Sequence, residues 1–203
     1  DYLSFFAFSF LKESSMERTP HYCHQENQFK ELSCRDAKIM MLGDSITEDG
    51  RWNEIFERED IINRGIGGNT VHGALQALQY CLNPGLKKAF VMVGINDISR
   101  GNDARNIFKT YRLLLETLSE HHVIPIVQST LYVGESKPGF YNHQVRELND
   151  LLKSYCLEHR IDYVDLNPLL APHGYLEGRF TIDGLHINGK GYTIWAEKIR
   201  HYF

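Results

Sequence analysis

The chain has 203 residues, of which 42% are hydrophobic and 24% are charged, and its formal net charge is −4. These values are typical of one globular domain that is large enough to bury its own core. Basic residues are neither in excess nor clustered, so the composition disfavours a nucleic-acid-binding protein.

The first 35 residues are predicted to form an N-terminal extension. Between Tyr2 and Leu11 lies an aromatic-rich segment that is too short to span a bilayer and has no basic residues before it. It is interpreted either as a surface helix or as a contact with a membrane surface or a partner. Residues 12–35 are polar and lead into a short helix that is expected near residues 25–32.

The extension also contains His21 and His24, with Cys23 between them. This spacing could supply metal ligands, but nothing downstream completes a ligand set, so no metal and no cofactor is predicted. The four cysteines have neither CxxC spacing nor the density of a disulfide scaffold. Free thiols and a cytoplasmic location are therefore favoured, although a Cys23–Cys34 bridge and a periplasmic or secreted location stay open.

An apolar run over residues 38–42 stops at Gly43 and is followed by Asp44 and Ser45. Such a run predicts a buried strand of a parallel sheet, and ligands of these sheets bind outside the carboxyl ends of the strands. Ser45 is therefore a candidate nucleophile at the edge of the sheet. The alternative is that Asp44 and Ser45 only cap the next helix.

Downstream, apolar runs alternate with segments of helical periodicity. This alternation predicts a parallel sheet with helices on both faces, in a single domain that spans residues 36–203. Further strands are expected from residue 61 and over residues 89–93, 123–127 and 161–165, and helices over about 50–59, 70–82, 103–122, 141–159 and 190–202. Residues 131–140 and 168–179 are expected to be loops.

Two of these strands lead into segments that could stabilise an oxyanion. Gly68 lies in a glycine-rich turn that lacks the GxGxxG spacing of a dinucleotide loop, and Asn96 follows Gly94 after the next strand. A glycine N–H and an asparagine amide are suitable donors for a developing negative charge. Asp97, beside Asn96, is expected to cap the following helix.

Near the end of the chain, Asp183 and His186 are three residues apart. A carboxylate at this spacing can accept a proton from one imidazole nitrogen while the other nitrogen stays free. A serine hydroxyl needs such a base, because unassisted it is a poor nucleophile at neutral pH.

The four segments, in this order, resemble the four blocks of the SGNH (GDSL-type) hydrolase superfamily: a GDS block, a glycine turn, a GxND block and a closing DxxH. The resemblance implies a three-layer α/β/α fold with a five-stranded parallel sheet of flavodoxin-like order 2-1-3-4-5. It implies that Ser45 is the nucleophile, His186 its base and Asp183 the orienting acid, with Ser45, Gly68 and Asn96 forming the oxyanion hole. Asn69, where the family often has Asp, and Ile187 are departures expected to affect loop geometry only.

The residues around the blocks resemble those of bacterial sugar and sialate O-acetylesterases and of platelet-activating-factor acetylhydrolase-like esterases. The resemblance implies a serine esterase that removes short acyl groups, chiefly acetyl, from a small-molecule ester such as an O-acetylated sialic acid. A lysophospholipase or thioesterase of the same superfamily and a catalytically idle binding module are the alternatives. Transfer of the acyl group and a homo-oligomeric state stay open.

Overall fold

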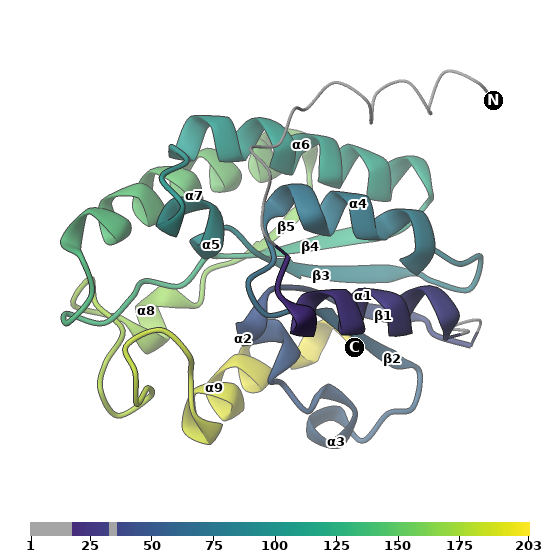
Figure 1. Ribbon diagram of the computed structural model, residues 1–203, viewed down its shortest axis with the longest axis horizontal. Helices are drawn as coiled ribbons and strands as arrows, with labels where there is room; N and C mark the ends of the chain where they lie inside the picture. The colour runs from purple at the N-terminus through teal and green to yellow at the C-terminus, as the bar shows by residue number, and fades with distance from the viewer. Residues whose placement is uncertain (1–17, 33–35) are drawn as a thin grey trace.

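In a computed structural model, which describes residues 18–32 and 36–203, the chain folds around a five-stranded parallel sheet (Figure 1). The strand order is β2-β1-β3-β4-β5, so the predicted fold class and strand order are confirmed. The aromatic segment between Tyr2 and Leu11, as well as Cys34, lie outside the described residues. The strands are β1 (Ile39–Gly43), β2 (Ile61–Gly65), β3 (Lys88–Met92), β4 (Ile124–Gln128) and β5 (Asp162–Val164).

Strand β1 lies in the middle of the sheet, and it is buried along its whole length. It pairs with β2 on one side and with β3 on the other. The direction in which strands are added therefore reverses between β1 and β3. Such a switch point is where open α/β sheets place their ligands, and Ser45 and Asn96 follow the two strands that border it.

Helices cover both faces of the sheet (Figure 1). Met40 and Leu42 of β1 pack with the helices of one face, whereas Ile39 and Met41 pack with those of the other, as the alternation of side chains along a strand requires. The first face carries α4 (Val71–Cys81), α6 (Ala104–Glu120) and α7 (Gly139–His159), and the second carries α3 (Trp52–Phe56), α8 (Asn167–Leu170) and α9 (Gly189–Ile199).

Helix α6 carries the stripe of apolar residues that was expected over residues 103–122. Its five predicted inner positions are all buried in the core of the first face, which confirms the interpretation of the helical spacing. These residues are Ile107, Tyr111, Leu114, Leu115 and Leu118.

Short helices make up the rest. Helices α2 (Ser45–Glu48) and α5 (Ile95–Ser99) follow β1 and β3 directly, and a 3₁₀ turn (Arg200–Tyr202) ends the fold. Helix α8 lies in what was expected to be a loop over residues 168–179, and the helix expected over 50–59 is only α3. The latter ends early because Glu57 takes a left-handed conformation, with φ of 53°.

The helix expected near residues 25–32 is α1 (Pro20–Glu31), which begins five residues earlier than predicted. Thr19 caps it, because its Oγ1 accepts a hydrogen bond from the Tyr22 N–H at 3.1 Å. Pro20 occupies the first helical position, where its missing N–H costs nothing. Helix α1 packs against α4, so this part of the predicted extension lies on the sheet domain (Figure 1).

Candidate active site

Three predicted residues from opposite ends of the domain form one hydrogen-bonded series. The Oγ of Ser45 lies 2.9 Å from Nε2 of His186, which is 141 positions later in the chain. The other ring nitrogen of His186, Nδ1, lies 2.6 Å from Oδ2 of Asp183. This is the arrangement in which an imidazole can accept a serine proton while a carboxylate holds its orientation.

Ser45 owes its position to the abrupt end of β1. The strand stops at Gly43, and Asp44 then caps α2, because its Oδ1 accepts a hydrogen bond from the Ile46 N–H at 3.0 Å. The two interpretations of this segment are therefore compatible: Asp44 caps the helix, and Ser45 opens its first turn facing His186. Asp44 is 1% exposed, and its burial raises the pKa of the carboxyl to about 7.

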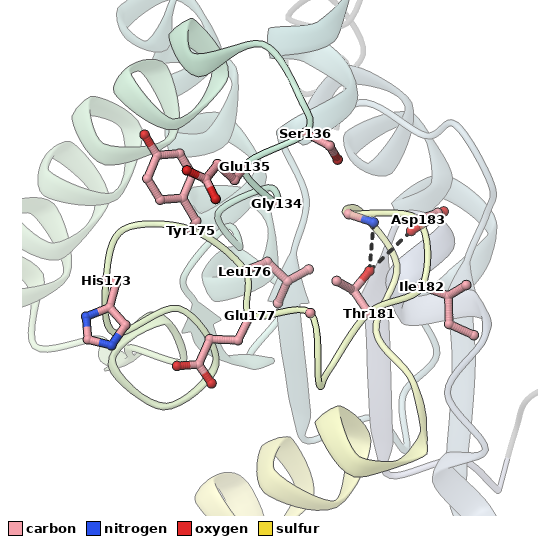
Figure 2. A pocket seen from close by; sticks show the side chains of 12 residues that line it. Gly134, Glu135, Ser136, His173, Tyr175, Leu176, Glu177, Thr181, Ile182 and Asp183 are labelled. Atoms are coloured by element: carbon pink, nitrogen blue, oxygen red, sulfur yellow. Dashed lines mark hydrogen bonds between the residues drawn. The ribbon is translucent and has the colours of Figure 1, made fainter.

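The loop before α9 fixes the Asp183 carboxylate from several sides. Its Oδ1 accepts hydrogen bonds from the backbone N–H groups of Leu185 at 2.9 Å and His186 at 2.8 Å. The Thr181 hydroxyl donates to the same oxygen and accepts from the Gly184 N–H (Figure 2). Burial alone would raise the pKa of Asp183, but the bonds from the His186 ring and the two backbone groups outweigh it. They hold this pKa well below its usual range, so the carboxylate stays charged.

Two of the three predicted oxyanion donors follow the strands on either side of β1. Gly68 lies in the turn after β2 with φ of 78°, and the Asn96 side chain lies in α5 after β3. Asn96 donates one amide hydrogen to the Asn69 carbonyl at 3.0 Å, which leaves its second hydrogen for another acceptor. Within residues 18–32 and 36–203, the backbone N–H groups of Ser45 and Gly68 donate to no protein acceptor.

Asn69 links the motif segments, a role that sequence reasoning assigned only to loop geometry. The residue is fully buried, and its Nδ2 donates to the Gly43 carbonyl at 3.2 Å. Its Oδ1 accepts from the Thr70 N–H at 3.0 Å and from the Tyr22 hydroxyl at 3.2 Å. Together with the bond from Asn96, these contacts join the segments that carry Ser45, Gly68 and Asn96.

Two further polar residues beside the glycine turn were not predicted in their observed roles. Arg100 donates from Nη2 to the Gly68 carbonyl at 2.7 Å, and no sequence motif marked it. Asp97 was expected to cap the helix after it, and this prediction is wrong. Asp97 lies inside α5, and Asp103 caps α6. The Oδ2 of Asp97 accepts from the Val71 N–H at 3.0 Å, so it stabilises the start of α4 instead.

His21 contacts a carboxylate of the sheet domain. Its Nε2 lies 2.8 Å from Oε1 of Glu48, and across the described part of the chain no group of three or more histidine, cysteine, aspartate or glutamate residues is arranged to hold a metal ion. Cys23 and Cys156 are free thiols. None of the helices in the described ranges is both long and apolar enough to cross a membrane.

A cavity of about 480 Å³ lies behind the Asp183 loop (Figure 2). One wall is the loop after β4, with Gly134, Glu135 and Ser136, and the other is the segment from His173 to Gly184. The two walls touch, since the Gly134 N–H donates to the Gly184 carbonyl at 2.7 Å. The lining side chains are mostly polar: Glu135, Ser136, His173, Tyr175, Glu177, Thr181 and Asp183.

The fold and this site together define a protein of the α/β/α class that carries a hydrogen-bonded series of serine, histidine and aspartate. Residues 41–194 match the family described as GDSL-like Lipase/Acylhydrolase family. The chain belongs to this family, so the predicted superfamily is confirmed.

The chain is also similar to individual proteins. The chain is 28% identical over 158 residues to an N-acylneuraminate cytidylyltransferase of Streptococcus agalactiae serotype III, and the match covers 78% of this chain but only 37% of that relative. It is 25% identical over 199 residues to the isoamyl acetate-hydrolyzing esterase of Saccharomyces cerevisiae, covering 80% of this chain and 84% of the esterase. A solved member of the lipolytic protein G-D-S-L family from Veillonella parvula superposes with a TM-score of 0.70 at 26% identity, covering 82% of this chain and 98% of that one.

Proposed function

We propose that this protein hydrolyses short-chain carboxylic esters, with Ser45 as the nucleophile. The observation that carries the proposal is the unbroken hydrogen-bonded series from Ser45 through His186 to Asp183. In this arrangement the serine is hydrogen-bonded to an imidazole, and a charged carboxylate orients the imidazole. The arrangement activates the serine hydroxyl at neutral pH.

In the acylation step, the Oγ of Ser45 attacks the carbonyl carbon of the ester as His186 Nε2 accepts the hydroxyl proton. The tetrahedral intermediate then expels the alcohol, which takes that proton from Nε2, and leaves the acyl group on Ser45. In the second step, water gives a proton to Nε2 and attacks the acyl carbon, and the carboxylic acid leaves as Ser45 regains its proton. Asp183 keeps Nδ1 protonated throughout, so Nε2 is free to accept.

Negative charge develops on the carbonyl oxygen in both steps. We assign its stabilisation to the N–H groups of Ser45 and Gly68 and to the side-chain amide of Asn96. Each donor of this kind contributes on the order of 10²–10³ to the rate, because it is oriented before the charge appears. Arg100 supports the assignment, because its hydrogen bond to the Gly68 carbonyl limits the rotation of the peptide that follows Gly68.

As the substrate we propose an O-acetylated carbohydrate, with an O-acetylated sialic acid as the first compound to test. The names of two relatives support this choice: one acts on an N-acylneuraminate and the other on an acetate ester. The cavity beside Asp183 also supports it, because its hydroxyl, carboxylate and imidazole groups suit a sugar better than a long acyl chain. The carboxylates of Glu135 and Glu177 in the lining favour a pose in which the sialate carboxylate points away from them.

The test is a panel of nitrophenyl esters from acetate to dodecanoate, run beside O-acetylated sialic acid and an uncharged O-acetylated sugar. We expect the acetate to be cleaved fastest in the ester series, and both O-acetylated sugars to be cleaved with a higher kcat/KM than the dodecanoate. Ser45→Ala should lower turnover by ~10⁴–10⁶ without changing the melting temperature. A maximum at long chains would instead indicate a lysophospholipase or thioesterase, and undiminished turnover in Ser45→Ala would refute the proposed nucleophile.

A further inference from the structure

Helix α1 contacts the glycine turn of residues 65–70, which is called the 65–70 turn below. The helix precedes all four motif segments in the chain. Arg18 anchors the start of α1, because it donates to Glu26 of the same helix and to Gln76 of α4. From this anchored helix, two successive side chains, His21 and Tyr22, reach the turn. Neither residue belongs to a motif of the family, and sequence reasoning gave them no part in the reaction.

Tyr22 contacts the turn at a gap in the surface of α4, where the helix has a glycine and no side chain. Its side chain is buried, with 3% of the residue exposed, and its hydroxyl donates to Oδ1 of Asn69. The gap exists because α4 has Gly73 at the crossing: a Cβ there would lie 2.2 Å from Asn69 Oδ1 and 2.8 Å from the Tyr22 oxygen. Gly73 lies in the first turn of α4, and a glycine within a helix costs stability, so its position where the tyrosine and asparagine meet points to the value of that contact.

His21 reaches the other end of the same turn. Its Nε2 is hydrogen-bonded to Oε1 of Glu48, and Oε2 of Glu48 accepts the Gly67 N–H at 2.6 Å. The imidazole also lies along Gly67, where an added Cβ would meet it at 3.5 Å. Gly68 is therefore flanked by two residues, Gly67 and Asn69, that are both tied to α1.

We propose that α1 is a positioning element of the active site, in which Tyr22 and His21 hold the 65–70 turn so that the Gly68 N–H and the Asn96 amide face the acyl oxygen. The inference rests on the proposed function, since it assumes that these groups stabilise the oxyanion. Tyr22 fixes the Asn69 side chain, the carbonyl of Asn69 holds the Asn96 amide, and Asn69 is bonded to Gly68 in the chain. Removing the contacts that Tyr22 and His21 make with the turn therefore weakens the stabilisation of the transition state more than it weakens substrate binding.

The test compares Tyr22→Phe with Tyr80→Phe in the full chain. Both changes remove one hydroxyl that links α1 to another segment. The Tyr22 hydroxyl bonds Asn69 of the turn, whereas the Tyr80 hydroxyl of α4 bonds Glu26 of α1 at 3.3 Å. We expect Tyr22→Phe to lower kcat on nitrophenyl acetate roughly tenfold with KM changed less than about twofold, and to weaken an arylboronic acid inhibitor by a similar factor. Tyr80→Phe should leave all three values unchanged.

A second pair keeps the test independent of the buried tyrosine. His21→Ala should lower kcat, whereas His21→Gln, whose amide can still donate to Glu48, should restore most of it. Hydrogen exchange measured by mass spectrometry gives a readout without turnover: the peptide that contains residues 65–70 should exchange faster in Tyr22→Phe and His21→Ala than in Tyr80→Phe.

Equal losses in Tyr22→Phe and Tyr80→Phe would overturn the inference, because they would reflect only the docking of α1. Unchanged kcat in Tyr22→Phe would also overturn it, whether or not exchange in the turn increases. Failure of the proposed function has a different signature, in which Ser45→Ala retains turnover. In that case the exchange comparison alone decides whether α1 holds the turn.

Discussion

Replacing Asp183 by asparagine tests whether the carboxylate sets the proton position on His186. In the structure, Oδ1 of Asp183 accepts the backbone N–H groups of Leu185 and His186, while Oδ2 faces the His186 ring. An asparagine must place its carbonyl oxygen where Oδ1 lies, since its NH₂ group would otherwise face two N–H donors. Its NH₂ then faces Nδ1 of His186, which can only accept.

The consequence is the wrong tautomer of the imidazole. With Nδ1 accepting, the proton moves to Nε2, which can no longer accept the proton of Ser45. We expect kcat to fall by ~10²–10⁴, which corresponds to about 3 to 5 kcal/mol of transition-state stabilisation. The assay is steady-state hydrolysis of nitrophenyl acetate, with Asp150→Asn, an exposed carboxylate on α7, as the control that should remain at the wild-type rate.

Thermal unfolding separates this effect from a disordered loop. The backbone bonds to position 183 survive in the variant, so its melting temperature should stay close to that of the wild type. If Asp183→Asn kept the wild-type rate, Asp183 would be a loop residue only, and Ser45 and His186 would act as a pair.

Two further predictions concern stability. Asn149 of α7 is buried, and it accepts from the Thr130 N–H at 2.9 Å and donates to the Thr130 carbonyl at 2.8 Å. Asn149→Ala should therefore lower the free energy of unfolding by about 2–3 kcal/mol in urea, while Asn102→Ala at an exposed position should change it by less than about 0.5 kcal/mol; equal effects would refute the role of the two bonds. The second prediction concerns Asp44. Burial is the main cause that raises the pKa of its carboxyl from 3.8 to about 7; the nearby Asp97 also raises it, whereas the His186 charge lowers it. The folded state therefore holds this proton more tightly than the unfolded state. Stability should fall as pH rises through this window, by up to on the order of 4 kcal/mol, and Asp44→Asn should gain stability relative to the wild type from about pH 4 to about pH 7. A pH-independent difference in urea unfolding would contradict the raised pKa.

The sequence predicts the sheet well because its strands are short apolar runs between turn residues. β1 and β3 are buried almost along their whole length, so their composition alone marks them as central strands. The members of the hydrogen-bonded series were also predictable, since Ser45, Asp183 and His186 lie in motifs with recognisable spacing.

The start of α1 was predictable in principle. Thr19 followed by Pro20 is a helix start signal, although the two residues were expected to belong to the connection before the helix. Tyr22 and Phe29, the buried residues of α1, are far apart in the sequence and form a weak apolar pattern. In the structure, Tyr22 and Phe29 pack with Ile66, which is the residue that follows β2.

The contacts around the glycine turn could not be predicted by local rules. Asp97 stabilises α4 rather than the helix that follows it, and Tyr22 meets Asn69 from 47 positions away. Such bonds depend on which chain segments meet in three dimensions, and a single sequence contains no periodicity that encodes them.

The most direct measurement of the central claim is the site at which a fluorophosphonate attaches. This reagent reacts with an activated serine hydroxyl, so the intact wild-type protein should gain one phosphonyl group, and peptide mapping should place it on Ser45. Ser45→Ala should gain no mass, and Asp183→Asn should react far more slowly, because His186 no longer accepts the proton. A label on another serine, or labelling of Ser45→Ala at the wild-type rate, would contradict the assignment of Ser45 as the nucleophile.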